Sequence, residues 1–169
     1  DDRRSCVLFG DGAGAVAIEA SDEDGLLGFL LRSDGTRGGV LNLPALDNGE
    51  VLADSAQHRQ GGYRPIEMNG QEVYKFAVRE VPSVLQSLLE RCDVGPETVD
   101  WLLLHQANQR ILDAVADRFA IPKQKVLSNL AHYGNTSAAT IPLVLDEAVR
   151  DGRVRSGHLL ASSGFGAGL

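Results

Sequence analysis

The feature of this sequence that most constrains its fold is an alternation, after residue 70, of short apolar runs with longer amphipathic stretches. In residues 71–91, apolar side chains recur at three- and four-residue spacing, which predicts a helix with one face toward a core. The run "VDWLLLH", residues 99–105, is short and apolar, which indicates a strand. This part of the chain is therefore expected to be a helix followed by a strand.

The same pattern continues to the last residue. Asn108 has the side chain of a helix N-cap, and Pro122 is expected to end the helix that follows it. Residues 125–130 predict a short strand, residues 141–152 a helix, and residues 157–169 a last strand that runs into glycines. The repeated order of strand and helix predicts an α/β fold with a layered sheet, whose chemistry lies in the loops that leave the strand ends.

The N-terminal part holds three glycines, Gly10, Gly12 and Gly14, whose spacing is reminiscent of a nucleotide-binding loop. Such a loop must open a helix, whereas the following "AVAIEA" alternates like a strand. The glycines are therefore expected to allow tight backbone packing, or positive φ within a hairpin. Residues 26–35 predict another strand ending in a turn, and residues 36–64 a long loop that is a candidate binding surface.

Charge and composition exclude several classes of function. Lys and Arg number 16 against 23 Asp and Glu, a net charge of −7, so nucleic acid and anionic membranes are not expected partners. No apolar run reaches the roughly 18 residues of a membrane span and no signal peptide is recognisable, so a cytoplasmic location is expected. The two cysteines, Cys6 and Cys92, lack metal-ligand spacing, so no metal is expected.

Polar groups follow three successive strand-like runs. His105 follows the first, Asn135 lies in the loop after the second, and "GFGAG", residues 164–168, follows the third. One sheet edge could therefore bring together an imidazole, a carboxamide and free backbone N–H groups. Donors aimed at a developing negative charge stabilise an enolate or a tetrahedral oxyanion, and removing one such donor typically costs about 2.7–4 kcal/mol in the barrier.

The motifs "HQAN", residues 105–108, and "GNTSAAT", residues 134–140, occur with "FGDGAGA" before them and "GFGAG" after them. Together they resemble the C-terminal part of the β-ketoacyl-acyl-carrier-protein synthase III family, over essentially the whole chain. The resemblance implies a thiolase-like α/β fold, in which residues 1–25 end the first half and residues 26–169 form most of the second βαβαβ half. Its last strand is then missing, and both ends of the chain are expected to be cut.

The resemblance implies a decarboxylative condensation of an acyl-coenzyme A starter with malonyl-acyl-carrier protein, the step that initiates fatty-acid synthesis. His105, as a neutral donor, and Asn135 are then expected to bind the malonyl thioester carbonyl and stabilise the enolate. The backbone N–H of Ala167 is expected to be an oxyanion-hole donor. No cofactor is implied, because coenzyme A and the carrier phosphopantetheine enter as substrate thioesters.

Other residues take roles from the same resemblance. The expected substrate tunnel is formed by Gly70, Tyr74, Ala107, Asn108 and Phe165. Gln106 and Arg110 are the expected contacts with an acyl-carrier protein, which is acidic. Arg110 would form a local basic patch with Arg118, Lys123 and Lys125. The family also implies a homodimer.

The chain departs from the family in one respect. The family's nucleophilic cysteine matches neither Cys6 nor Cys92 and lies upstream of residue 1, so this chain alone is not expected to complete the condensation. Two alternatives stay open. One is an enzyme like a type III polyketide synthase, and the other is a non-catalytic half-domain that binds a carrier protein or coenzyme A.

Overall fold

The computed structural model describes residues 5–22, 25–44 and 64–166. The described part contains α-helices (α), 3₁₀ helices (η) and short strands (β). In chain order these are η1 (Gly35–Arg37), β1 (Leu41–Asn42), β2 (Glu67–Met68), α1 (Gly70–Arg91), η2 (Pro96–Thr98), β3 (Trp101–Leu104), α2 (Gln109–Arg118), η3 (Lys123–Lys125), α3 (Leu130–Tyr133), η4 (Ser137–Ala139), α4 (Thr140–Arg150) and β4 (Leu160–Ser163).

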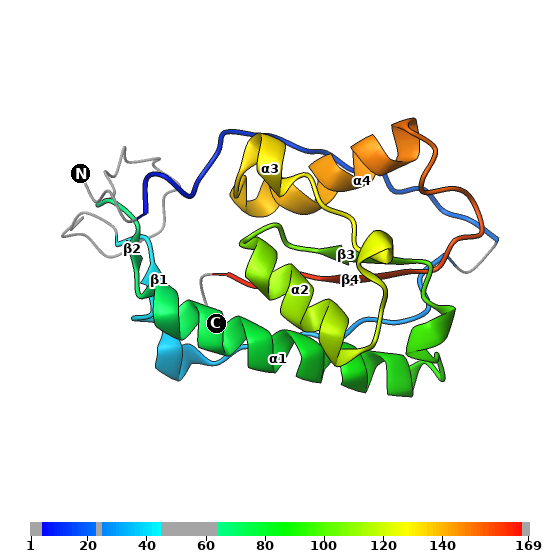
Figure 1. Cartoon of the computed structure of the whole chain (residues 1–169), viewed down its shortest axis with the longest axis horizontal. Helices are drawn as coiled ribbons and strands as arrows, with labels where there is room; N and C mark the ends of the chain where they lie inside the picture. The colour runs from blue at the N-terminus through cyan, green and yellow to red at the C-terminus, as the bar shows by residue number, and fades with distance from the viewer. Residues whose placement is uncertain (1–4, 23–24, 45–63, 167–169) are drawn as a thin grey trace, which may run out of the picture.

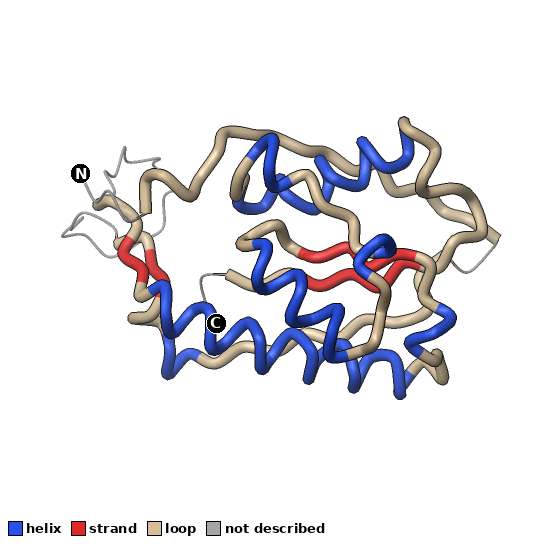
Figure 2. Tube along the Cα trace, viewed as in Figure 1, coloured by secondary structure: helices blue, strands red, loops and turns tan. Residues whose placement is uncertain are grey.

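A parallel pair of strands, β3 and β4, lies at the centre of the layered part of the chain, with Trp101 opposite Leu160 and Leu104 opposite Ser163. Figures 1 and 2 show α1 and α2 on one side of this pair and α3 and α4 on the other. Successive side chains of a strand point to opposite faces. Accordingly, Leu102 and Leu104 pack with α1 and α2, whereas Leu103 packs with α4. The predicted α/β layering is thus present.

The strand predicted at residues 125–130 is reduced to a single parallel bridge. Val126 pairs with Leu102, and the N–H of Leu127 donates to the carbonyl of Leu102 at 3.0 Å. The chain then enters α3 at Leu130. This segment therefore lies beside β3, as the layered order requires, although it forms no longer ladder among the described residues.

The helices α1 and α2 begin close to the predicted positions. The side chain of Asn69 caps α1, and that of Asn108 accepts the Arg110 N–H at 2.9 Å, which confirms the N-cap of α2. However, α2 ends at Arg118 rather than at Pro122. Ala120 adopts a φ of 52°, and the Ile121 N–H bonds back to the carbonyl of Ala116 at 3.0 Å, a pattern that terminates helices.

The strands predicted near residues 15–20 and 26–35 are wrong. Both segments have no ladder partner in the described part of the chain, and their apolar side chains are exposed, as with Ile18 at 92% and Leu31 at 84%. Figure 1 shows residues 5–22 running over α3 and α4, and the segment from residue 25 running along α1. An alternating pattern can only become a strand when a partner backbone lies beside it.

The glycines of the N-terminal segment allow tight packing, as predicted, but they form no hairpin. A Cβ at Gly10 would lie 2.0 Å from the carbonyl oxygen of Tyr133, and one at Gly14 would lie 2.4 Å from Cγ of Pro142. The Gly10 N–H donates to the carbonyl of Asn135 at 2.9 Å, and the Asn135 N–H to that of Leu8 at 3.0 Å. This segment therefore holds the backbone of the loop that carries Asn135.

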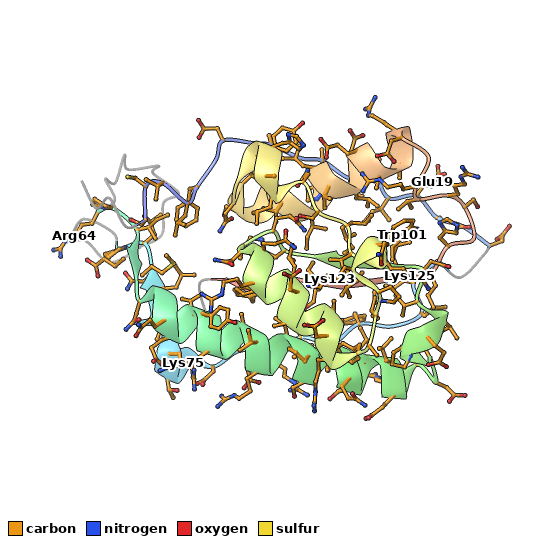
Figure 3. All side chains as sticks on the ribbon, viewed as in Figure 1. Glu19, Arg64, Lys75, Trp101, Lys123 and Lys125 are labelled. Carbon is orange, nitrogen blue, oxygen red and sulfur yellow. The ribbon has the colours of Figure 1, made fainter. Side chains whose placement is uncertain are left out.

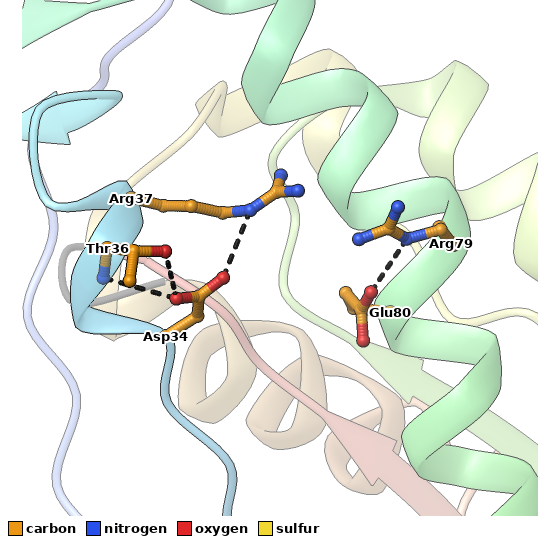
Figure 4. Close-up of polar contacts among 5 residues, drawn as sticks. All are labelled: Asp34, Thr36, Arg37, Arg79 and Glu80. Atoms are coloured by element: carbon orange, nitrogen blue, oxygen red, sulfur yellow. Dashed lines mark hydrogen bonds and ion pairs between the residues drawn. The ribbon is translucent and has the colours of Figure 1, made fainter.

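The predicted long loop, of which residues 45–63 lie outside the described residues, contains η1 and the strand β1. β1 pairs antiparallel with β2. Asp34 organises η1 by accepting hydrogen bonds from the Thr36 N–H at 3.1 Å and from Nε of Arg37 at 3.2 Å, as Figure 4 shows. The guanidinium of Arg37 lies 5.9 Å from the ring centre of Phe76, which links η1 to α1. Among the described residues, none of the helices is long and apolar enough to cross a bilayer.

Candidate active site

His105 follows β3 directly, and its backbone N–H continues the ladder by donating to the carbonyl of Ser163 at 2.9 Å. The ring of Phe165 stands edge-on to the imidazole, with ring centres 5.3 Å apart. Nδ1 lies 2.6 Å from Oγ1 of Thr140. Burial lowers the pKa of His105 below its ordinary value of 6.5, because desolvation disfavours the charged imidazolium. The imidazole is therefore neutral at physiological pH.

Gln106 is fully buried, so the prediction that it contacts a carrier protein directly is wrong. Its exposed fraction is 0%, and its Nε2 donates to the carbonyls of Leu104 at 2.7 Å and Leu127 at 3.2 Å. Its Oε1 accepts the Asn129 N–H at 3.3 Å. Through these hydrogen bonds with backbone groups, the buried amide of Gln106 joins the end of β3 to the segment from Leu127 to Asn129.

Asn135 lies in the loop between α3 and η4, after Gly134, whose φ of 65° is in the region that favours glycine. Its side-chain Oδ1 accepts the Ser137 N–H at 2.9 Å. Because a backbone N–H can bond only to the oxygen of the carboxamide, the amide nitrogen remains as the donor for a ligand.

His105 and Asn135 line the same cavity, whose volume is about 550 Å³. The residues expected to form the substrate tunnel line it too, namely Gly70, Tyr74, Ala107, Asn108 and Phe165. The structure thus brings together most of the predicted site, while the individual roles stay predictions. Ala167 lies outside the described residues.

Several residues that line this cavity were not anticipated. They include Leu41 and Met68 from the β1–β2 pair, and Ser137 and Thr140 around η4. β1 and β2 have two residues each, which is too short for any periodicity to reveal. Ser137 and Thr140 do belong to the "GNTSAAT" motif, but the motif gave no reason to select their hydroxyl groups as part of the site.

The predicted basic patch is only partly available. Arg110 is exposed near the start of α2, and its guanidinium lies 4.9 Å from the ring centre of Tyr74. Figure 3 shows Lys123 and Lys125, the first and last residues of η3, near one another. However, Lys123 lies 3.8 Å from Asp113, and Nζ of Lys125 donates to the carbonyl of Val99 at 2.8 Å. The ammonium of Lys125 therefore keeps its charge but spends one hydrogen bond on the fold, and its part in the basic patch stays a prediction.

Neither cysteine lines the cavity that holds His105 and Asn135. Cys6 is exposed, and Cys92 lines a separate cavity of about 910 Å³ between α1, the segment from Gly25 to Asp34, and β4. Within the residues that the structure describes, no cluster of His, Cys, Asp or Glu could hold a metal ion.

Family models match most of this chain. Residues 1–35 match the family described as 3-oxoacyl-[acyl-carrier-protein (ACP)] synthase III, and residues 89–169 match its C-terminal domain. Over its whole length the chain is 81% identical to the β-ketoacyl-[acyl-carrier-protein] synthase III of Synechococcus sp. strain WH7803, of which it covers 50%.

Two solved structures show the same architecture. The 3-oxoacyl-[acyl-carrier-protein] synthase III of Aquifex aeolicus VF5 superposes on 100% of this chain with a TM-score of 0.85 at 40% identity, over 50% of its own chain. The 3-oxoacyl-(acyl carrier protein) synthase III of Pseudomonas aeruginosa PAO1 superposes on 99% of this chain with a TM-score of 0.83 at 40% identity, again over 50% of its own chain. The thiolase-like α/β fold class is thereby confirmed. The chain spans about half the length of the relatives it matches, and it belongs to the β-ketoacyl-[acyl-carrier-protein] synthase III family.

Proposed function

We propose that this chain supplies the His/Asn part of the active site of a β-ketoacyl-acyl-carrier-protein synthase III. The reaction is the decarboxylative condensation of an acyl-coenzyme A starter with malonyl-acyl-carrier protein, which gives a β-ketoacyl-carrier protein. The remaining half that the relatives possess would supply the cysteine that holds the acyl group. Below, "full-length synthase" denotes this chain joined to that half.

The observation that carries the proposal is the arrangement of donors at one cavity. His105 and Asn135 both line it, and the carboxamide oxygen of Asn135 is already bonded to the Ser137 N–H. The imidazole is partly buried, and it is neutral at physiological pH because desolvation lowers its pKa. Both side chains can therefore present an N–H to a thioester carbonyl without giving up a proton.

Two neutral donors fit the chemistry of malonyl decarboxylation. When the bond between the α-carbon and the carboxylate breaks, carbon dioxide leaves and its bonding electrons form an enolate on the thioester. The negative charge collects on the thioester oxygen, where donors that are already oriented stabilise it more than they stabilise the ground state. The α-carbon then attacks the acyl thioester carbonyl, and the cysteine thiolate leaves.

The partners and assembly are part of the same proposal. Coenzyme A and carrier-bound phosphopantetheine would enter as substrates along Tyr74, Ala107, Asn108 and Phe165, and no resident cofactor or metal is proposed. Arg110 would contact the carrier protein. A homodimeric, cytoplasmic enzyme is proposed, together with a division of the chain at residue 25 between the first and the second thiolase-like half.

The donor roles are tested by His105→Ala and Asn135→Ala in the full-length synthase. Each variant is expected to lower the rate of malonyl-carrier decarboxylation by about a hundredfold or more, since each removes one donor to the enolate oxygen. Acyl loading of the cysteine from acyl-coenzyme A should remain close to the unmodified rate. Both are measured separately, by release of labelled carbon dioxide and by the intact mass of the acylated protein.

A matched control is Asn69→Ala, which removes an amide outside the cavity at the cap of α1 and should leave both rates nearly unchanged. The assignment of the donors is refuted if loading and decarboxylation fall together in the two site variants. Binding of carrier protein or coenzyme A by a full-length protein without any condensation would instead favour the non-catalytic alternative.

A further inference from the structure

The side chain of Thr140, the first residue of α4, forms a hydrogen bond with Nδ1 of His105. Its exposed fraction is 1%, and its Oγ1 lies 2.6 Å from Nδ1 of the imidazole. Among the described residues, Nε2 has no protein hydrogen-bond partner, which leaves this nitrogen for a ligand in the cavity that His105 lines.

A neutral imidazole has one N–H, so its two nitrogens cannot both donate. Donation from Nε2 to a thioester oxygen requires the hydrogen on Nε2, and Nδ1 must then accept a hydrogen bond. The other tautomer would turn a lone pair of Nε2 toward the thioester oxygen, where it would repel the developing negative charge. The partner of Nδ1 therefore decides whether His105 can act as a donor.

The hydroxyl of Thr140 has one hydrogen and two neighbours that could accept it. Besides Nδ1, the carbonyl oxygen of Ser137 lies 3.0 Å from Oγ1. That carbonyl already receives the backbone N–H of Thr140 at the end of η4, whereas Nδ1 of the Nε2–H tautomer has no other donor. The hydroxyl can donate to that carbonyl while an Nδ1–H donates to Oγ1, or it can donate to Nδ1, which is the nearer of the two at 2.6 Å. Only the second arrangement leaves the hydrogen on Nε2, as the donor role given to His105 requires.

We propose that Thr140 is a positioning residue, whose hydroxyl donates to Nδ1 of His105 and thereby keeps the hydrogen on Nε2 for the substrate carbonyl. The proposal rests on the donor role given to His105 above. The edge of Phe165 restrains the same ring at a centre-to-centre distance of 5.3 Å, so the ring is held both by packing and by a directed hydrogen bond.

The test compares two substitutions in the full-length synthase. Thr140→Val keeps the branched shape but removes the hydroxyl, and it should lower decarboxylation by about tenfold, the effect of one net hydrogen bond. Thr140→Ser keeps the hydroxyl and should stay within about threefold of the unmodified rate. Acyl loading should be unchanged in both variants, because the proposed role concerns only the malonyl step.

A spectroscopic measurement separates this role from a merely structural one. With ¹⁵N-labelled histidine, the unmodified protein should show a non-protonated Nδ1 and a protonated Nε2 for His105, assigned by their loss in His105→Ala. Thr140→Val should shift the ring toward a mixture of tautomers, and Thr140→Ser should not.

Failure of this inference is distinguishable from failure of the proposed function. If His105→Ala leaves decarboxylation intact, the donor role of His105 itself is refuted. If His105→Ala abolishes it but Thr140→Val matches the unmodified enzyme in rate and tautomer, only the role of Thr140 is refuted. The role of Thr140 is likewise refuted if Thr140→Ser is as slow as Thr140→Val, or if loading falls with decarboxylation.

Discussion

The surroundings of His105 determine both the position of its ring and its protonation state. Its position at the end of β3 brings the ring edge-on to Phe165 and beside Thr140, where it is partly buried. The same burial lowers its pKa, so the ring stays a neutral donor. In the proposed function this shift is an advantage, because a neutral imidazole can donate a hydrogen bond to the thioester oxygen without giving up a proton.

The lowered pKa predicts a pH dependence of stability. Below its ordinary pKa of about 6.5, the unfolded chain binds a proton at this histidine more readily than the folded chain does. The free energy of unfolding should therefore fall as the pH decreases below that value, and this contribution should be absent above it. Urea unfolding of the full-length synthase at about pH 7.5 and about pH 5.5 measures the difference.

His105→Gln is the reference for that measurement, since its side chain does not titrate. The unmodified protein should lose more stability between the two pH values than the variant does. Equal losses would show that His105 binds its proton as easily in the folded state as in the unfolded state. Decarboxylation by the unmodified enzyme should stay active somewhat below pH 6.5, where a solvent-exposed histidine would already be charged.

The N-terminal segment and the α3–η4 loop position Asn135 together. The Phe9–Asn135 bridge fixes the loop through two backbone hydrogen bonds, and Gly10 allows the close approach to Tyr133 that the bridge requires. The two motifs "FGDGAGA" and "GNTSAAT" are thus in direct backbone contact, and the first supports the loop formed by the second. An element far away in sequence thereby sets the position of a site residue.

Gly10→Ala should therefore affect both stability and the site. Its Cβ would lie 2.0 Å from a backbone oxygen, so the loop that carries Asn135 must move. We expect a loss of about 1–3 kcal/mol in the free energy of unfolding, together with slower decarboxylation. Gly39→Ala is the control, since a Cβ there meets no atom within 4 Å, and it should change stability by less than about 0.5 kcal/mol. Equal effects of the two substitutions would contradict the docking of the N-terminal segment.

Charge acts over the whole chain. The net charge of −7 opposes association with an acidic partner, so any such partner must meet a local cluster of cations. With Lys125 bonded to Val99 and Lys123 close to Asp113, the exposed guanidiniums of α2, Arg110 and Arg118, are the candidates that remain of the predicted patch. Arg110 also lies against Tyr74, which lines the site cavity, so a carrier docked there could reach the proposed tunnel.

Arg110→Glu should weaken recognition of the carrier but not of the thioester. We expect KM for malonyl-carrier protein to rise about tenfold at low salt, with a smaller rise at high salt because screening removes the electrostatic contribution. KM for a malonyl-coenzyme A analogue should change little. Arg91→Glu makes the same charge change at the far end of α1 and serves as control. A similar rise for both substrates would place Arg110 in the tunnel rather than at a docking surface.

Much of the layered part of this fold could be predicted from local patterns. α1 follows from its apolar stripe, α2 from its apolar stripe and the Asn108 cap, and β3 from its run of leucines, because these signals lie within or next to the element that they specify. The predictions for residues 15–20 and 26–35 failed for the complementary reason. Their alternating side chains indicate strands, but a strand forms only beside another backbone. The residues of a segment do not show which other segment, if any, will pair with it.

The sequence by itself determined the helices α1, α2 and α4, the order of the layers, and the family motifs that contain His105 and Asn135. Only the tertiary structure decided that Gln106 is a buried brace, that Lys125 bonds to a carbonyl, and that Thr140 meets Nδ1 of His105. The physical reason is range. Periodicity and capping act within a few residues, whereas burial and side-chain hydrogen bonds depend on segments that are distant in the sequence, such as the 35 positions between His105 and Thr140.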